Sequence, residues 1–171
     1  MMATQAQLPV SAKTLGMLFE LTYTVFHRNT EGISHDDSVQ SPDPAGNCMN
    51  WVAGHVVVSR DGLLQLLGQS PVWGADEAAT YKRGSAPLTD PSKALPWPAI
   101  VSALESSQER LRAGLAALTP EQLASPMPAD RNPFGVGSMG ETIAALSFHE
   151  SYHMGQFGIL RRLSGRKGAI Q

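Results

Sequence analysis

The sequence predicts an all-α protein built as a four-helix bundle. Four stretches, near residues 11–30, 47–67, 98–118 and 138–165, place apolar residues three or four positions apart, which is the spacing of one helix face. No stretch of useful length alternates apolar and polar residues as a strand does. The connection over residues 69–97 is long enough to cross the bundle, so the second and third helices need not be antiparallel neighbours.

Composition predicts one soluble domain spanning residues 1–171. Hydrophobic residues make up 42% of the chain and charged residues 16%, which is ordinary for a globular protein. A net charge of −2 gives no electrostatic reason to expect nucleic acid or an anionic membrane as partner. No stretch reads as a signal peptide or a membrane span, and the single cysteine, Cys48, suits a reducing compartment. We therefore expect a cytoplasmic protein.

Capping residues set the expected bounds of the first three helices. Ser11 is a candidate N-cap for a helix that runs to about Thr30, and Asn47 is a candidate N-cap for the second helix. Pro98 is a favourable first residue for the third helix, which we expect to end near Leu118. The pattern Thr119-Pro120-Glu121-Gln122 is a capping box and predicts a short helical turn before the last long helix.

Two stretches between the expected helices read as connections. Residues 36–46 contain Pro42, Pro44 and Gly46 and read as a loop. In the long connection, the aromatic residues Trp73, Tyr81 and Trp97 should either pin the chain over an edge of the core or help to roof a cavity.

The last helix should begin at the capping box Ser138-Met139-Gly140-Glu141 and end near Gly165. Its apolar spacing predicts a buried face that polar residues interrupt: Thr142, Leu146, His149, His153, Gln156, Leu160 and Leu163. His149 and His153 are four residues apart, so their imidazoles lie one turn apart and point the same way. A divalent metal is the simplest ligand that satisfies both rings.

A third metal ligand must come from another helix. The letters His149-Glu150-Ser151-Tyr152-His153 match the zincin pattern, but no His, Asp, Glu or Cys follows His153, so the pattern has no downstream third ligand and a protease is disfavoured. His55 lies on the expected core face of the second helix. We predict that it is the missing ligand, which gives three imidazoles on one ion and leaves coordination positions open.

Other polar residues have competing interpretations. His27 lies off the core face of its helix and His35 beyond it, so we expect solvated or locally bonded rings. Glu150 is either a general base or a solvated surface carboxylate, and its place about 100° around the helix from His149 favours the surface role. Gln156 and Asn50 either orient imidazoles or make ordinary core hydrogen bonds. Cys48 is expected to be a small buried residue rather than a nucleophile.

The chain resembles the DinB-like (YfiT-like) superfamily of four-helix-bundle metalloenzymes from about Leu15 to Gly165. The resemblance rests on these residues: Asn50-Trp51, Gly54-His55, Pro133-Phe134-Gly135, His149-x-x-x-His153-x-Gly155-Gln156, Leu160-Arg161-Arg162 and Gly165. It implies an up-down-down-up bundle with a long crossover connection, often dimeric, in which His55, His149 and His153 bind a metal. The family's name records induction by DNA damage and implies no DNA polymerase.

Relatives that use low-molecular-weight thiols suggest a metal-dependent transferase or isomerase acting on a small electrophile. The alternatives are a non-catalytic metal-binding stress-response protein and a small metallohydrolase that uses metal-bound water. An all-nitrogen ligand set does not by itself choose among zinc, nickel, cobalt, iron and copper. We expect zinc or nickel, with iron, cobalt or manganese as further candidates. We expect a homodimer with a small-molecule substrate, with neither nucleic acid nor membrane as partner, and the sequence names no catalytic residue.

Overall fold

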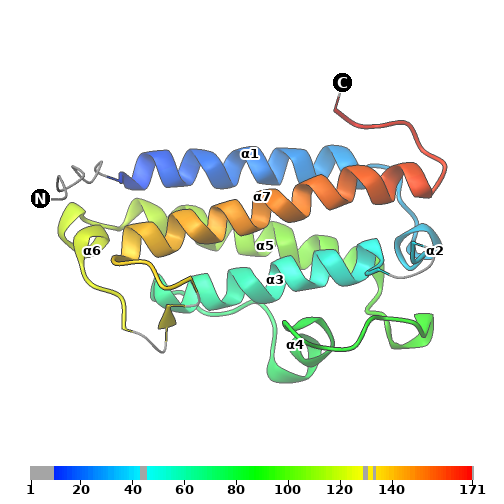
Figure 1. The fold of residues 1–171 in the computed structure, drawn as a ribbon, viewed down its shortest axis with the longest axis horizontal. Coiled ribbons are helices and arrows are strands. Elements are labelled where there is room, and N and C mark those ends of the chain that lie inside the picture. Colours follow the sequence, from blue (N-terminus) through cyan, green and yellow to red (C-terminus); the bar gives the residue numbers. More distant parts are fainter. Residues whose placement is uncertain (1–9, 43–45, 129–130, 133, 171) are drawn as a thin grey trace, which may run out of the picture.

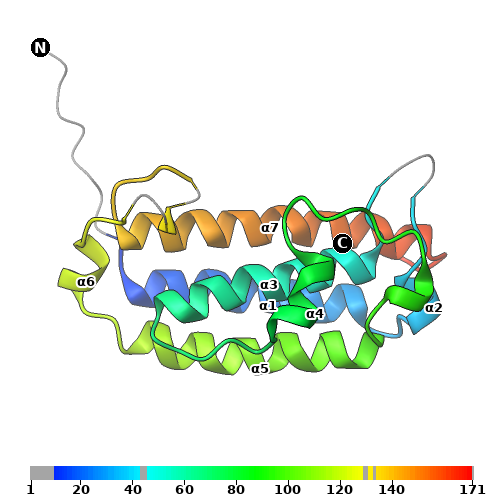
Figure 2. The same ribbon diagram turned by 90° about the horizontal axis from the view of Figure 1, so that it is seen from below.

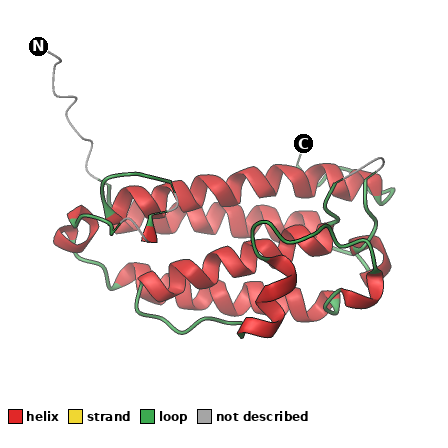
Figure 3. Ribbon diagram, turned by 60° about the horizontal axis from the view of Figure 1, so that its bottom comes forward, coloured by secondary structure: helices red, strands yellow, loops and turns green. Residues whose placement is uncertain are grey.

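The computed structural model of the protein describes residues 10–42, 46–128, 131–132 and 134–170, and within these ranges it is helical. The described part contains no strand, only an isolated bridge between Pro126 and Ser138. Figure 3 shows the helices in red. The predicted fold class, an all-α four-helix bundle, is therefore confirmed.

Four long helices form the bundle: α1 (Ala12–Thr30), α3 (Met49–Leu66), α5 (Trp97–Ala116) and α7 (Met139–Leu163). Shorter helices occupy the connections: α2 (His35–Ser38), α4 (Ala75–Tyr81), the 3₁₀ turn η1 (Pro91–Lys93) and α6 (Pro120–Ala124). Among the described residues, no helix combines the length and the apolar character needed to cross a membrane.

Cross-helix contacts show how the long helices are oriented. Thr22 and Asn29 of α1 meet Glu150 and Arg161 of α7 in the same order, so these two helices run in the same direction. Both α3 and α5 run the opposite way, and the chain from α3 to α5 returns along the outside of the bundle through α4 and η1 (Figures 1 and 2).

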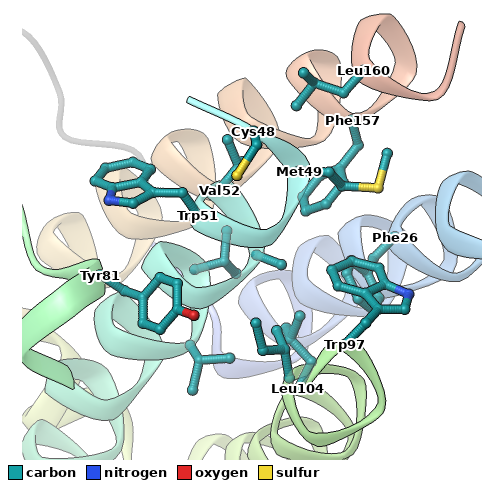
Figure 4. Close-up of a cluster of buried hydrophobic side chains, with 14 of the residues drawn as sticks. Phe26, Cys48, Met49, Trp51, Val52, Tyr81, Trp97, Leu104, Phe157 and Leu160 are labelled. Carbon is teal, nitrogen blue, oxygen red and sulfur yellow. The ribbon is translucent and has the colours of Figure 1, made fainter. Parts of the chain in front are cut away.

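The core consists of two apolar clusters with a polar layer between them. One cluster, drawn in Figure 4, gathers Phe26, Met49, Val52, Trp97 and Phe157, among others. The second lies toward the other end of the bundle and includes Leu15, Phe19, Leu63, Leu111 and Ile143. Between them lie buried polar side chains from all four helices: Thr22, Arg60, Ser107 and Glu150.

The connection between α3 and α5 is fixed to the bundle at defined points. The buried carboxylate of Asp61 accepts hydrogen bonds from the backbone N–H groups of Val72 and Trp73. Further along, the fully buried Tyr81 donates its hydroxyl to Asn50 Oδ1 at 2.8 Å and accepts from the backbone of Leu95. The expectation that aromatic residues pin this connection is met by Tyr81 and Trp97, which are both buried.

Most expected helix bounds agree with the structure, and the exceptions have simple causes. Ser11 and Ser138 cap their helices, and the capping boxes at Thr119 and Ser138 are formed. Asn47 is not the cap of α3, because the helix begins after Cys48 without a side-chain cap. Pro44 and Pro133 lie outside the described residues.

The predicted buried face of the last helix is wrong in part. Leu163 is 56% exposed, whereas Ile143, Glu150, Met154 and Phe157 are buried. The face toward the bundle centre is thus rotated from the predicted one, and the histidines lie on its flank, toward α3. The predicted face contained polar residues because it was centred on the side of α7 that carries the histidines and not on the side that faces the bundle centre.

Gly54 is required by the close approach of α4 to α3. A Cβ atom at this position would lie 2.3–2.7 Å from atoms of the Tyr81 ring, which is held by its hydroxyl and cannot move aside. We expect Gly54→Ala to lower the free energy of unfolding by about 1–3 kcal/mol, the usual cost of overpacking. Urea denaturation measures this change.

Gly62 supplies the matched control on the same helix. It has no atom within 4 Å of the corresponding Cβ position, so Gly62→Ala should be neutral or stabilising by up to about 1 kcal/mol. Equal stability of the two variants would show that the packing of Tyr81 on Gly54 does not constrain the fold.

Candidate metal centre

Three histidines from two helices converge at one point. His55 comes from α3, and His149 and His153 come from successive turns of α7. The Nε2 atom of His149 lies 3.3 Å from Nε2 of His55 and 3.1 Å from Nε2 of His153. Imidazoles on a tetrahedral ion at 2.0–2.1 Å would have nitrogens roughly 3.3 Å apart. The three rings are thus spaced as ligands of one ion, and the group could hold a metal.

Hydrogen bonds at the outer ring nitrogens fix the tautomers of two of these histidines. His55 Nδ1 lies 2.8 Å from the carbonyl oxygen of Tyr81, which can only accept, so Nδ1 carries the proton and Nε2 a lone pair. His153 Nδ1 lies 2.7 Å from Gln156 Oε1, and this assigned amide orientation gives the same tautomer. Both lone pairs face His149, whose single ring proton can satisfy only one of them. A cation at the centre satisfies all three rings.

The surroundings keep the rings in the neutral form that binds metals. Burial lowers the pKa of His149 to about 4, assisted by its neighbours His153 and His55. Burial is also the largest cause of the lowered pKa of His55 and of His153. The positive charge of Arg83 lowers the pKa of His55 and His149 further. At neutral pH all three Nε2 atoms can therefore act as ligands.

An aromatic side chain lies beside each of the three histidines. The Trp51 ring stacks on His55 with centroids 5.0 Å apart, and Tyr152 and Phe134 lie beside His153 and His149. His55 and His153 are buried, while His149 is partly exposed. A narrow cavity of about 10 Å³, room for about one water molecule, lies inward of the site and is lined by His149, Glu150, Ser59 and Arg60, among others.

Glu150 is not a surface carboxylate, contrary to the expectation from the sequence. It is 3% exposed, and both carboxylate oxygens accept hydrogen bonds from Arg60: Nη2 to Oε1 at 2.6 Å and Nε to Oε2 at 2.8 Å. The Thr22 hydroxyl donates to the same carboxylate. Glu150 points into the bundle because a step of 100° from His149 turns its side chain toward the centre rather than toward solvent. Its oxygens are engaged, so Glu150 does not act as the base of a zincin.

Arg60 completes a polar layer that contacts all four long helices. Besides Glu150 on α7, its Nη1 donates to the Ser107 hydroxyl at 3.0 Å and to the Leu104 carbonyl on α5. Thr22 of α1 reaches the layer through Glu150. A sequence signal for Arg60 exists, because it lies four residues after the buried Val56 and three before the buried Leu63, in an otherwise apolar phase.

The other polar candidates have distinct places. Gln156 orients an imidazole, whereas Asn50 makes core hydrogen bonds to Tyr81, Leu95 and Ser38. His27 packs on Tyr23, and His35 accepts from the backbone of Trp97, so both rings make local contacts outside the group. Cys48 is buried, and burial raises the pKa of its thiol.

One contributor was not anticipated from the sequence. The carbonyl of Tyr81 belongs to the long connection and carries no side-chain signature. This contact has an indirect sign in the sequence: Gly54, immediately before His55, is a glycine because only glycine leaves space for the Tyr81 ring.

Fold and site together define a helical bundle whose second and fourth long helices supply a three-histidine centre. The family model of the DinB superfamily matches residues 18–157, so the chain belongs to this superfamily. Its fold is similar to the crystal structure of a conserved protein from Enterococcus faecalis, with a TM-score of 0.68 and 15% sequence identity over 89% of this chain and 95% of that one. No curated protein matches the sequence.

Removing one partner of the buried ion pair should destabilise the fold strongly. Arg60→Met leaves the Glu150 carboxylate buried without its cation, which typically costs about 3–5 kcal/mol. The measurement is the free energy of unfolding of metal-free protein in urea. Arg112→Met is the matched control, because Arg112 pairs with Glu20 at the surface and should contribute less than about 1 kcal/mol. Equal losses in the two variants would contradict a central role for Arg60.

Metal binding should persist to lower pH than ordinary histidines allow. Free histidine titrates near 6.5, but the lowered pKa values keep these rings neutral as the pH falls, to about 4 for His149. We expect bound Co²⁺ at pH 6 and its progressive loss toward pH 4, followed by visible absorption. His27→Ala should match wild type, and His149→Ala should bind at least 10-fold more weakly at pH 7. Unchanged Co²⁺ binding by His149→Ala would show that the three histidines are not the metal site.

Proposed function

We propose that the protein is a metal-dependent enzyme that transfers or isomerises a small electrophile with the help of a low-molecular-weight thiol. The observation that carries this proposal is the convergence of three neutral imidazole Nε2 atoms with no fourth His, Cys, Asp or Glu in the group among the described residues. His55, His149 and His153 would hold zinc or nickel, with iron, cobalt or manganese as other fits. When bound, such an ion supplies Lewis acidity, which lowers the pKa of a coordinating thiol or water.

The residues around the histidines have roles that suit this chemistry. Tyr81 and Gln156 hold protons at the Nδ1 atoms of His55 and His153 and so keep their Nε2 atoms directed at the centre. Trp51 and Tyr152 place aromatic rings beside His55 and His153, where they would contact a bound electrophile. The charge of Arg83 favours an anionic ligand beside His149.

The position of Glu150 favours thiol chemistry over hydrolysis. A metallohydrolase of the zincin type uses the glutamate next to its first histidine as the base that takes a proton from water. Here that carboxylate is held by Arg60 and Thr22 inside the bundle. A thiol, which ionises far more readily than water, needs no such base.

Cobalt substitution tests the proposal directly. We expect Co²⁺-loaded protein to develop a near-ultraviolet charge-transfer band with at least one thiol among bacillithiol, mycothiol, glutathione, coenzyme A and cysteine. The same thiol should react with a model electrophile faster with wild type than with His153→Ala. His27→Ala, outside the group, should behave as wild type.

Two negative results point to the other functions. A cobalt protein that gives no band with any thiol, yet exchanges its water ligand, would favour the metallohydrolase. A cobalt protein that exchanges neither would favour a non-catalytic metal-binding protein of the stress response.

A further inference from the structure

A short turn at the end of α4 places a charged residue close to the three histidines. The backbone carbonyl oxygen of Tyr81 lies 2.8 Å from Nδ1 of His55, and Arg83 follows Tyr81 by two residues. Because consecutive Cα atoms are about 3.8 Å apart, the Cα atom of Arg83 lies within about 8 Å of that of Tyr81. The chain itself therefore holds Arg83 near the metal centre.

Hydrogen bonding and a glycine define the shape of this turn. Residues 82–85 form a β-turn in which the Ser85 N–H donates to the Lys82 carbonyl oxygen at 3.0 Å. Gly84 has a φ of +81°, which the third residue of a type II turn requires. Arg83 is the second residue of the turn and is exposed. The turn thus presents Arg83 to solvent in a defined backbone conformation.

The far end of the turn is attached to the ring that stacks on His55. The Ser85 hydroxyl accepts a hydrogen bond from Nε1 of Trp51 at 3.1 Å and donates to the Thr80 carbonyl oxygen at 2.7 Å. The Trp51 ring stacks on His55 with the two planes 10° apart. Contacts that lead to His55 therefore hold the turn on both sides of Arg83. Its cation is kept beside the centre.

The guanidinium of Arg83 has no role inside the protein. Among the described residues it forms neither a hydrogen bond nor an ion pair. Guanidinium is a planar fork of N–H donors whose geometry matches that of a carboxylate. Other arginines of the chain use this fork on carboxylates or carbonyl oxygens: Arg60, Arg110, Arg112, Arg161 and Arg166. Arg83 is free to bind a carboxylate from outside.

The electrostatics of the centre favour a ligand with more than one negative group. The charge of Arg83 acts on the rings of both His55 and His149 and lowers their pKa. The carboxylate next to His149, that of Glu150, is already paired with Arg60 inside the bundle. Three neutral imidazoles also leave the charge of a divalent ion uncompensated. A thiolate balances part of this charge, and a second anionic group on the same molecule can pair with Arg83.

We propose that Arg83 is a specificity-determining residue of the centre and selects a thiol that carries a carboxylate. The sulfur of this ligand occupies the open coordination position, and its carboxylate, a few bonds away, accepts a pair of hydrogen bonds from the guanidinium. A thiol without the carboxylate lacks the second contact and binds less tightly. The inference rests on the proposed function, because it takes a thiol as the metal ligand.

A matched pair of small thiols tests the inference through binding alone. The compound 3-mercaptopropionate carries a carboxylate, and 2-mercaptoethanol carries a neutral hydroxyl in its place. Each is titrated into Co²⁺-loaded protein, and the charge-transfer band gives its dissociation constant. The ratio of the two constants is then compared between variants, so that the different acidities of the two thiol groups cancel.

Arg83→Gln should weaken the binding of 3-mercaptopropionate about 3- to 10-fold and leave that of 2-mercaptoethanol unchanged. Lys82→Gln is the matched control. It removes the same charge from the adjacent exposed residue of the turn, but the charge of Lys82, unlike that of Arg83, is not a cause of the lowered pKa of His55. Lys82→Gln should change neither constant. Equal losses in the two variants would overturn the inference, because any nearby cation would then suffice.

Salt and a conservative substitution separate the guanidinium contact from a structural effect of the variant. Raising the ionic strength from about 10 mM to about 1 M shortens the Debye length from about 30 Å to about 3 Å. The difference between wild type and Arg83→Gln in binding 3-mercaptopropionate should shrink accordingly. Arg83→Lys, which keeps the charge but loses the fork, should retain part of the affinity. A difference that high salt leaves intact would overturn the inference.

The same titrations distinguish failure of this inference from failure of the proposed function. Bands with both thiols, with equal ratios in wild type and Arg83→Gln, would leave thiol ligation intact and overturn the role of Arg83. No band with either thiol would contradict both. Propionate, which has the carboxylate but no sulfur, should not displace 2-mercaptoethanol from the cobalt protein. Displacement by propionate in wild type but not in Arg83→Gln would overturn the assignment of the carboxylate to the thiol.

Discussion

The ion pair between Arg60 and Glu150 is the constraint on which the rest of the bundle depends. A charge buried at this depth is tolerated only when it is paired and its remaining hydrogen-bonding capacity is satisfied, and here Thr22, Leu104 and Ser107 complete the set. The hydrophobic effect is non-directional, whereas a bidentate Arg–carboxylate contact fixes the geometry of both partners. The pair therefore sets the rotation of α7 against α3. Since His149 adjoins Glu150 in the chain, the same rotation directs His149 and His153 toward His55.

The three histidine ligands and the groups that orient their rings come from different parts of the chain. The ligands come from rigid helices, whereas the groups that fix their ring orientation come from two different sources. Gln156 lies three residues after His153 on the same helix, so its contact follows from helical geometry. The Tyr81 carbonyl reaches His55 from a separate segment, and that contact exists only because Gly54 lets the Tyr81 ring pack against α3.

Sequence reasoning predicted the bundle, the caps at Ser11 and Ser138 and the shared direction of His149 and His153, because these depend on local spacing. His55 lies 94 residues before His149 and was predicted from its place on the expected core face of its helix. Sequence reasoning failed on the rotation of α7: apolar spacing alone placed Leu163 inside and left Glu150 outside. The true rotation depends on Arg60, and a pairing between residues 90 positions apart leaves no periodic signal. The contact of the Tyr81 carbonyl with His55 could not be predicted either, since every residue has a backbone carbonyl and its role does not depend on residue type. Short helices such as α4 depend on tertiary contacts and fall below the length at which spacing is informative.

The way the connection from α3 to α5 is attached has an evolutionary consequence. Hydrogen bonds hold it to the bundle at several points, among them the Asp61 carboxylate at its start and Tyr81 in its middle. Val72, Trp73 and Leu88 of this connection pack on the core, whereas other residues, such as Lys82 and Arg83, are exposed. Substitutions at the exposed positions leave these core contacts and the three ligands in place. Over evolution, the residues that surround the three histidines can therefore change the chemical preference of the site while the histidines themselves stay in place.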